Sequence, residues 1–381
     1  MKIAILNRQF SAAGGGAERY SIALVEQLAA RHELHVFAQH MEHQWPGVTY
    51  HRVSQPFRRP RWLNQLWFAT ATWWATRRGF DLVHSHENTW HGQVQTVHVL
   101  PVKYNLFHGR MGWARILRWV KVLSSPRLLA YLWLERRRFS LVRPRAIVLT
   151  SQSLVTQTLT AYPGCQHAIE IITPGVCFVR AASTFDEKCA ARQSLGLPLA
   201  GRCVLFVGND YRKKGLPALI AALPRLGPDC YLAVVGNASH VPAFKAQAGA
   251  LADRVHFLGS LKNMEDAYAA ADCLAHPTLE DTFAMVVLEA MAHGLPVVVS
   301  CEKYCGIAGL LTHEANALLL DDPTDVSALA DALTRLANDP WLCQRLALAA
   351  NDFAAQHLWR EAAQKQESVY MVLAQQTRHE P

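Results

Sequence analysis

Short apolar runs rich in β-branched residues alternate with segments of helical periodicity, and this alternation occurs twice along the chain. In the first half, strands are predicted at residues 2–6, 34–37, 81–84, 93–97 and 146–149, with a helix at 17–31. In the second half, strands are predicted at 203–207, 231–235, 255–258, 273–275 and 296–300, with helices at 216–225, 241–252, 264–271 and 283–293. Strands that alternate with helices form a parallel sheet covered on both faces. The pattern predicts an α/β fold with two doubly wound, Rossmann-like domains.

A length of 381 residues is enough for two hydrophobic cores. We expect an N-terminal domain over residues 1–180, a second domain over 181–357, and a C-terminal helix over 358–381 that returns to the first domain. The join is expected within the more polar stretch 178–201. Ligands of such folds bind at the carboxyl ends of the strands, so we expect ligand binding in a cleft between the domains.

Hydrophobic segments and cysteines bear on the cellular location. Apolar residues never run uninterrupted for about 20 positions, and the N-terminus leads directly into the first predicted strand, without a signal-peptide core. All nine cysteines lie after residue 164 at uneven spacing, which favours reduced thiols. Cys301 and Cys305 lack histidines at zinc-site spacing, so no metal is expected. We therefore expect a cytoplasmic protein.

Positive charge is concentrated in residues 103–138. This segment holds nine basic residues and one acid, Glu135, and its net charge of +8 equals that of the whole chain. Such a concentration predicts contact with an anionic surface. The basic residues are Lys103, Arg110, Arg115, Arg118, Lys121, Arg127, Arg136, Arg137 and Arg138.

The same segment predicts an amphipathic helix that ends before Pro126. Apolar residues recur at 113, 116, 117 and 120, with arginines on the other side, which is typical of a helix lying in a membrane interface. The alternative is a core helix whose arginines face water. Nucleic-acid binding is not expected, because no known recognition module is present. We expect peripheral association with the inner face of the cytoplasmic membrane through Arg110, Trp113, Arg115, Arg118, Trp119 and Lys121.

Three consecutive glycines, Gly14, Gly15 and Gly16, separate the first predicted strand from the first helix. Glycines there let backbone N–H groups approach a diphosphate at the helix N-terminus. NAD binding is disfavoured, because Arg19 stands where the dinucleotide motif has its last glycine and the second strand ends without a ribose-binding acid. A plain tight turn is the alternative.

A second loop between a strand and a helix, residues 208–215, reads Gly-Asn-Asp-Tyr-Arg-Lys-Lys-Gly. Its cations Arg212, Lys213 and Lys214 follow the carboxyl end of a strand, where they can pair with phosphates. A solvated loop is the alternative interpretation.

An acid pair in residues 279–290 is the most specific motif. Seven residues separate Asp281 from Glu289, a span of about 12 Å in a helix. This spacing places Glu289 against ribose hydroxyls and Asp281 near hexose hydroxyls, with the helix N-terminus facing the phosphates. Glu289 lies in an apolar run, which is unusual for an acid without a partner. The alternative is a structural glutamate.

The order of the three motifs resembles the family 4 retaining glycosyltransferases, which have the GT-B fold, and the resemblance covers essentially the whole chain. Lys213, Lys214 and Gly215, together with Cys305 and Gly306, make it most similar to the lipopolysaccharide core glucosyltransferase I branch. The resemblance implies retaining transfer of a hexose from a nucleotide-diphosphate sugar, with UDP-glucose or a related UDP-hexose as the expected donor. It implies a glycolipid or lipopolysaccharide-core acceptor, no metal and no cofactor.

Site residues follow from the resemblance. Gly15 and Gly16 would lie under the diphosphate and the sugar. Lys214, helped by Lys213 or Arg212, would neutralise the leaving phosphate, and Asp281 would hold sugar hydroxyls. Glu289 would hold the ribose, and His98 would contact the sugar, with a general base as its alternative role. The remaining donor-binding positions are the backbone N–H groups of Phe283 and Ala284 and the base-edging residues Gly259, Leu261 and Met264.

The sequence departs from the family pattern at three positions. Asp281 replaces the usual glutamate, so Glu280 is an alternative first acid, Ala284 replaces a glycine, and Asn209 replaces an arginine. Four further polar residues near a strand end either face the acceptor or bond locally. They are His84, His86, Glu87 and His91.

Two other functions compete with transfer. A sugar-nucleotide epimerase of the same fold would need extra acid–base residues and has little use for a basic, tryptophan-rich surface. A catalytically inactive membrane adaptor is expected to lose its cleft charges, yet Lys214, Asp281 and Glu289 are present. The transferase interpretation is therefore favoured.

Overall fold

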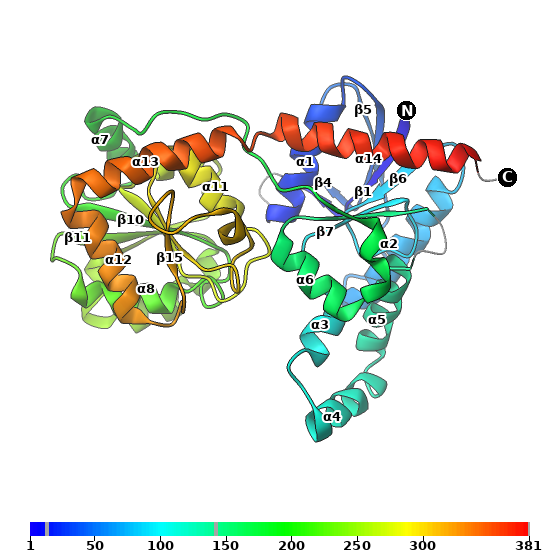
Figure 1. Ribbon diagram of the computed structural model, residues 1–381, viewed down its shortest axis with the longest axis horizontal. Helices are drawn as coiled ribbons and strands as arrows, with labels where there is room; N and C mark the ends of the chain where they lie inside the picture. Colours follow the sequence, from blue (N-terminus) through cyan, green and yellow to red (C-terminus); the bar gives the residue numbers. More distant parts are fainter. Residues whose placement is uncertain (12–14, 141–143, 380–381) are drawn as a thin grey trace. The chain divides into compact units, whose positions relative to one another are not determined.

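The computed structural model describes residues 1–11, 15–140 and 144–379. The chain forms two compact units, of which unit 1 comprises Met1–Pro174 with Trp359–Pro381, and unit 2 comprises Gly175–Leu358. Each unit is an α/β structure built on a parallel sheet, as the alternating sequence pattern predicts (Figure 1).

Unit 1 contains a seven-stranded parallel sheet in the order β5-β3-β1-β6-β7-β8-β9. The central strands are hydrophobic runs because helices cover both of their faces. β1 lies between β3 and β6, so Ile5 pairs with Val36 on one side and His84 on the other. The strands are β1 (Lys2–Leu6), β3 (Glu33–Ala38), β5 (Val48–Arg52), β6 (Leu82–Ser85), β7 (Val94–Val97), β8 (Ala146–Leu149) and β9 (Ile169–Ile171). A separate short pair is formed by β2 (Gln9–Phe10) and β4 (His40–Met41).

The helices of unit 1 include the last helix of the chain, which packs against the first. Trp359 meets Tyr20 edge-on at 5.2 Å, and Glu367 pairs with His32 at 2.9 Å. The C-terminal helix therefore belongs to the same core as the N-terminal strands. The helices are α1 (Gly16–Leu28), α2 (Arg61–Thr76), α3 (Val102–Phe107), α4 (Gly112–Leu123), α5 (Pro126–Arg138), α6 (Gln152–Ala161) and α14 (Trp359–His379).

Unit 2 contains a six-stranded parallel sheet in the order β12-β11-β10-β13-β14-β15. Successive residues of a strand point to opposite faces, so Leu205 packs in one core and Phe206 in the other. The strands are β10 (Arg202–Val207), β11 (Cys230–Val235), β12 (Val255–Gly259), β13 (Cys273–His276), β14 (Val297–Ser300) and β15 (Leu318–Leu320). The helices are α7 (Phe185–Ser194), α8 (Leu216–Ala222), α9 (Val241–Ala248), α10 (Glu265–Ala270), α11 (Met285–Ala292), α12 (Val326–Asn338) and α13 (Pro340–Ala355).

The two units divide between Pro174 and Gly175, and most of the stretch 178–201, where the join was expected, forms helix α7 and its flanks in unit 2. A capping box between Thr184 and Glu187 starts α7, which packs against α10. The Arg192 guanidinium is buried, donates to the Ala270 carbonyl at 3.0 Å and pairs with Asp272 at 2.8 Å. Polar residues here cap and anchor a helix, whereas the sequence interpretation took them for a linker.

Candidate functional site

The lysine turn of unit 2 connects β10 to α8. Gly208 and Gly215 are required here, because a Cβ at Gly208 would lie 2.8 Å from Lys214 and one at Gly215 would lie 1.9 Å from the Pro277 carbonyl. Lys214 donates to Asp281 Oδ2 at 2.5 Å and to the Glu280 carbonyl at 3.3 Å. An ammonium group has three donors, so one further acceptor can bind Lys214.

The other two cations of the turn have different surroundings. Lys213 pairs with Glu280 at 2.5 Å in an exposed ion pair. Arg212 is exposed and lies over the Phe244 ring, 5.8 Å from its centroid. The structure therefore joins Lys214 with Asp281 and Lys213 with Glu280, and it places Arg212 with neither acid.

Asp281 is held by donors on both carboxylate oxygens. Oδ1 accepts the N–H groups of Ala284 at 2.9 Å and Phe283 at 3.3 Å, while Oδ2 contacts Lys214 and the His276 Nε2 at 3.2 Å. Burial alone raises the pKa of Asp281, but the His276 hydrogen bond and the Lys214 charge outweigh it and lower the pKa. Asp281 is thus ionised and holds Lys214 in place.

His276 was not predicted from the sequence. It ends β13 as a fully buried side chain, and burial lowers its pKa although the contact with Asp281 opposes this. The neutral ring donates to Asp281 through Nε2. No spacing signal identifies His276, because its role depends on the return of the chain from β13 to Asp281.

Helix α11 begins next to Asp281 and supports Glu289. Ala284 precedes α11 with a φ of +71°, a left-handed conformation that favours glycine, which explains why the family pattern has glycine there. Tyr268, on α10, donates its hydroxyl to Glu289 Oε2 at 2.6 Å and stacks on His293 at 4.9 Å. Tyr268 was not predicted from the sequence.

The predicted base-edging residues follow β12. Gly259 has a φ of +69°, and its carbonyl accepts the Gly236 N–H at 2.9 Å. Leu261 and Met264 are half-buried and pack against the core that contains α11. Contact with a base stays a prediction for all three residues.

In unit 1, the candidate residues follow the carboxyl ends of β1, β6 and β7, which are neighbours in the sheet. Gly15 and Gly16 start α1 after β1, and Gly14 lies outside the described residues. His86 follows β6, and its Nδ1 lies 3.0 Å from the His98 Nε2 after β7. Tyr20 meets the His98 ring edge-on at 5.0 Å.

Burial determines the charge state of these histidines. It lowers the pKa of His98 to about 3, and the Arg138 charge adds to this effect. The pKa of His86 is also lowered well below its usual value, mainly by burial. Both rings are therefore neutral near pH 7, and one of the facing nitrogens must donate a proton to the other.

The polar residues beside them bond locally. His84 contacts the Tyr370 hydroxyl at 2.6 Å and the Thr96 hydroxyl at 2.7 Å. Glu87 pairs with Arg8 at 2.9 Å. His84 and Glu87 therefore have local hydrogen-bond and ion-pair partners in unit 1, and contact with an acceptor stays a prediction.

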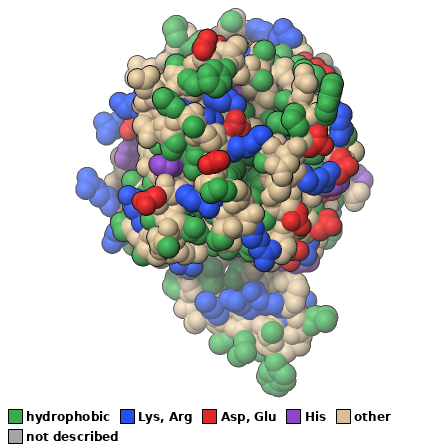
Figure 2. Space-filling model, turned by 90° about the vertical axis from the view of Figure 1, so that its left-hand side faces the viewer, with side chains coloured by type: hydrophobic (Ala, Val, Ile, Leu, Met, Phe, Trp, Pro, Cys, Tyr) green, Lys and Arg blue, Asp and Glu red, His purple; other side chains and the backbone are tan. Residues whose placement is uncertain are grey.

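The predicted amphipathic helix is α4, and its apolar stripe faces solvent. Trp113 is 79% and Leu117 66% exposed, whereas Val122 packs against Leu106 and Leu128. The alternative of a core helix is therefore wrong. Figure 2 shows the resulting lobe at the bottom of the view, with hydrophobic side chains at its tip and basic side chains above them.

The predicted membrane residues lie on or beside this helix. Arg115, Trp119 and Lys121 are exposed, and Arg118 is half-buried. Arg110 donates to the Leu106 carbonyl and, at 3.1 Å, to the Asn105 carbonyl. Among the described residues, no helix combines the length and apolar character needed to cross a bilayer.

Arg138 does not belong to this basic surface. It is 5% exposed and donates to the Gln95 side chain at 3.1 Å and to the Thr96 carbonyl at 2.5 Å. Glu135 is buried in the same way. The two buried charges have opposite signs and cancel, so the net charge of +8 over 103–138 comes from the other eight basic residues.

A second aromatic and basic surface was not predicted. Residues 43–80 contain six arginines and no acid. On α2, which packs against α5, Trp73 is partly exposed and Trp74 is 57% exposed, and Arg77 lies 3.9 Å from the centroid of the Trp74 ring. The sequence feature that could have identified this surface is the local excess of arginine. It is hidden in the net charge of the whole chain, because acidic residues elsewhere offset it.

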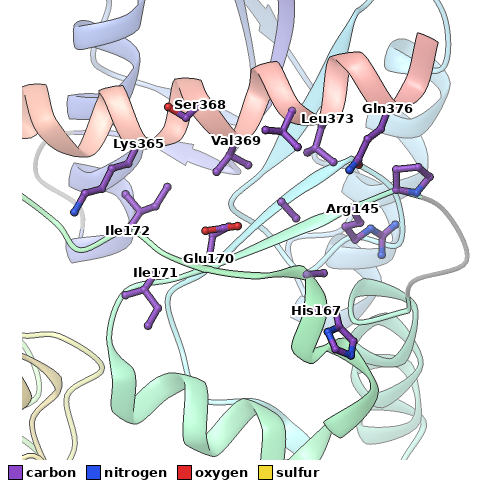
Figure 3. A pocket seen from close by; sticks show the side chains of 14 residues that line it. Arg145, His167, Glu170, Ile171, Ile172, Lys365, Ser368, Val369, Leu373 and Gln376 are labelled. Atoms are coloured by element: carbon purple, nitrogen blue, oxygen red, sulfur yellow. The ribbon is translucent and has the colours of Figure 1, made fainter. Parts of the chain in front are cut away.

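A pocket of about 630 Å³ lies between α14 and the β8–β9 edge of unit 1 (Figure 3). Its lining includes Arg145, Glu170, Lys365 and Leu373 and none of the residues predicted to bind the donor. Among the described residues, no three His, Cys, Asp or Glu side chains gather as metal ligands. The pocket is therefore distinct from the residues predicted to bind the donor.

Two family models match the chain, one on each unit. Residues 14–178 match the model described as Glycosyltransferase Family 4, and residues 201–339 match the one described as Glycosyl transferases group 1. The first match includes Gly15, Gly16 and His98. The second includes Lys214, Asp281 and Glu289.

Curated relatives act on inositol compounds, according to their names. The chain is 31% identical over 248 residues to a D-inositol 3-phosphate glycosyltransferase of Xylanimonas cellulosilytica, covering 62% of this chain and 58% of the relative. It is 33% identical over 199 residues to a phosphatidyl-myo-inositol mannosyltransferase of Mycobacterium tuberculosis, covering 50% and 52%. The chain thus spans about half the length of the curated relatives it matches.

Solved structures share the fold over the whole chain. WaaG, a glycosyltransferase involved in lipopolysaccharide biosynthesis, superposes with a TM-score of 0.83 at 20% identity, covering 97% of this chain and 99% of its own. HepE of Anabaena in complex with UDP and glucose superposes with a TM-score of 0.75 at 20% identity, covering 98% and 99%. At these identities the likeness shows the fold alone.

Proposed function

Because the chain belongs to the family 4 glycosyltransferases, with their GT-B fold, we propose that it transfers a hexose from a UDP-sugar to a glycolipid with retention of configuration. The observation that carries this proposal is the arrangement in unit 2 of Lys214 paired with Asp281 just before α11, and of Glu289 on α11 itself. The donor assignment to UDP is supported by the HepE complex.

Unit 2 supplies the groups that a nucleoside diphosphate requires. Lys214 has one donor left for a phosphate, and Asp281 holds it there. Glu289, eight residues further along, offers carboxylate oxygens to ribose hydroxyls, and the Tyr268 hydroxyl fixes its orientation. This arrangement recognises negatively charged phosphates at the N-terminus of α11 and a diol about one turn further along the helix.

The transfer step needs no protein nucleophile. The bond between the sugar C1 and the phosphate oxygen breaks, and the acceptor hydroxyl oxygen bonds to C1 on the same face. The acceptor proton passes to the leaving phosphate, whose charge Lys214 stabilises. Because burial lowers the pKa of His98 to about 3, its ring accepts a proton poorly, and we assign it a hydrogen bond to the donor sugar rather than the role of a general base.

The acceptor is proposed to be a glycolipid at a membrane surface, in lipopolysaccharide core biosynthesis. The exposed apolar stripe of α4 and the basic residues beside it fit the interface of an anionic bilayer. WaaG acts in lipopolysaccharide biosynthesis, and the mycobacterial relative is named for a phosphatidylinositol substrate. Both names point to lipid acceptors, and we place the protein peripherally at the inner face of the cytoplasmic membrane.

A transfer assay tests both parts of the proposal. UDP-glucose labelled with ¹³C at C1 is incubated in EDTA with anionic vesicles that contain either a lipopolysaccharide inner-core acceptor or phosphatidylinositol. We expect an α-linked product in the first vesicles, because the donor is α-linked and configuration is retained. A β-linked product would overturn retention, product only with phosphatidylinositol would move the acceptor to inositol lipids, and an epimerised UDP-sugar would identify an epimerase.

The same assay tests the α4 surface. The triple variant Arg115→Gln, Arg118→Gln and Lys121→Gln should lose at least about tenfold in vesicle affinity, since each basic residue near the surface contributes about 1 kcal/mol. Transfer should fall with binding, whereas slow donor hydrolysis in solution should stay unchanged. The matched control replaces three basic residues of unit 2, Lys245, Arg225 and Arg335, with Gln. Unchanged co-sedimentation of the α4 variant would move the membrane surface elsewhere.

A further inference from the structure

Two buried charges of α5 hold the segment that contains His98. Arg138 donates to the Thr96 carbonyl at 2.5 Å, two residues before His98. Glu135 accepts the N–H groups of Val102 at 2.5 Å and Lys103 at 3.2 Å, at the start of α3. Residues 98–101 are therefore tied to one helix at both ends.

The two side chains are suited to holding backbone. They lie three positions apart on α5, so both project from the same side of the helix towards β7 and α3. Each is 5% exposed, and a charge is buried at this depth only where hydrogen bonds compensate for lost hydration. Here the compensating partners are backbone groups on either side of residues 98–101, together with the Gln95 side chain and the Tyr162 hydroxyl.

His98 is fixed from the opposite direction. Its Nε2 lies 3.0 Å from the His86 Nδ1, the two nearly parallel rings have their centroids 5.3 Å apart, and Tyr20 approaches edge-on. These contacts act on the ring itself, whose place also depends on the position of the His98 backbone. That position is set by α5.

We propose that Glu135 and Arg138 are positioning residues that fix the His98 ring in one orientation and one tautomer. The expected effect on sugar transfer rests on the proposed function, whereas the expected effect on the His98 ring does not. Because α5 packs against α4 through Leu128 and Val122, the helix with the exposed apolar stripe is connected through α5 to the segment of His98. The hairpin α4–α5 therefore has a second role besides membrane contact.

The first readout is the state of the His98 ring, which requires no activity. In protein with ¹⁵N-labelled histidine, the ring-nitrogen signals of His98 are assigned as those that disappear in the variant His98→Gln. The parent should show two well-separated ring-nitrogen shifts of a single neutral tautomer. In Arg138→Gln and Glu135→Gln the two shifts should move toward each other, because a loosened segment lets the ring exchange between tautomers.

The second readout is steady-state transfer. We expect kcat to fall between about tenfold and a hundredfold in both variants, since a displacement of about 1 Å has effects of this size. The KM for UDP-glucose should change less than about twofold, and Arg138→Lys, which can still donate to the Thr96 carbonyl, should recover part of kcat. The control is Lys245→Gln, which removes a positive charge from an exposed position of unit 2.

The outcomes separate the two proposals. Unchanged His98 shifts in both folded variants would overturn the positioning role, whatever the activity. If the His98 shifts change in the variants but the parent protein transfers no sugar, the positioning role is supported and the proposed function is overturned. If Arg138→Gln fails to fold, Arg138→Lys and Glu135→Gln provide the same comparison.

Discussion

Replacing Lys214 with methionine is expected to lower kcat for sugar transfer by about a hundredfold to a thousandfold, the loss typical of removing one preorganised group from a developing negative charge. Methionine keeps the length of the side chain and removes the ammonium group that pairs with Asp281 at 2.5 Å. The KM for the donor should rise much less than kcat falls, because the charge on the phosphate develops as the bond to the sugar breaks.

Lys213→Met is the matched control, because it removes the same charge one residue earlier from an exposed pair with Glu280. It should lower kcat by less than about tenfold, in line with the small energies of exposed ion pairs. Lys214→Met also leaves Asp281 without one partner, so folding is checked with the double variant Lys214→Met, Asp281→Asn. A double variant that is stable and active would contradict the role of Lys214, as would equal losses from both lysine replacements.

Acidification from pH 7 to pH 5 is expected to reduce the free energy of unfolding by about 6 kcal/mol through His84, His86 and His98 together. Burial lowers the pKa of His84 and of His98 to about 3 and that of His86 well below its usual value of 6.5. The unfolded chain takes up a proton on each ring near pH 6.5, whereas the folded chain does not. Stability therefore falls as the pH drops below about 6.5, by about 2 kcal/mol per histidine at pH 5.

Urea unfolding followed by tryptophan fluorescence at pH 7 and pH 5 measures this loss. His86→Phe keeps an aromatic ring beside His98 and should reduce the difference between the two pH values by about 2 kcal/mol. His167→Gln removes an exposed imidazole from unit 1 and should leave the difference as in the parent. Equal differences in all three proteins would show that these buried rings do not cause the acid sensitivity.

The predicted parts of the fold were those with a local signal. Five strands of each sheet were located because helices cover each face, so runs such as residues 203–207 are apolar at every position. Strands β5 and β9 lie at the edges of the unit 1 sheet, contain polar residues and were missed. The short apolar strand β15, at the edge of the unit 2 sheet, was also missed. The polar residues of α7 were taken for a linker because capping and buried ion pairs are not visible in composition.

Individual residues of the candidate site were identified from the sequence, but the contacts between them were not. Lys214 and Asp281 were both identified, yet their mutual ion pair depends on the turn that returns from β13 to the lysine loop. His276 and Tyr268 had no motif of their own, since they act only on Asp281 and Glu289. The α2 surface was missed because the sum of charges over the whole chain conceals a segment with six arginines and no acid.

The most direct measurement of the central claim is a calorimetric titration of the protein, in EDTA, with UDP, GDP, ADP and NAD. We predict that UDP binds with a Kd in the micromolar range, about −8 kcal/mol. Glu289→Ala should weaken this binding at least about tenfold while the protein stays folded, because the ribose hydroxyls lose a charged partner. Binding of NAD in place of UDP, of no nucleotide at all, or of UDP with equal affinity in Glu289→Ala would contradict the account.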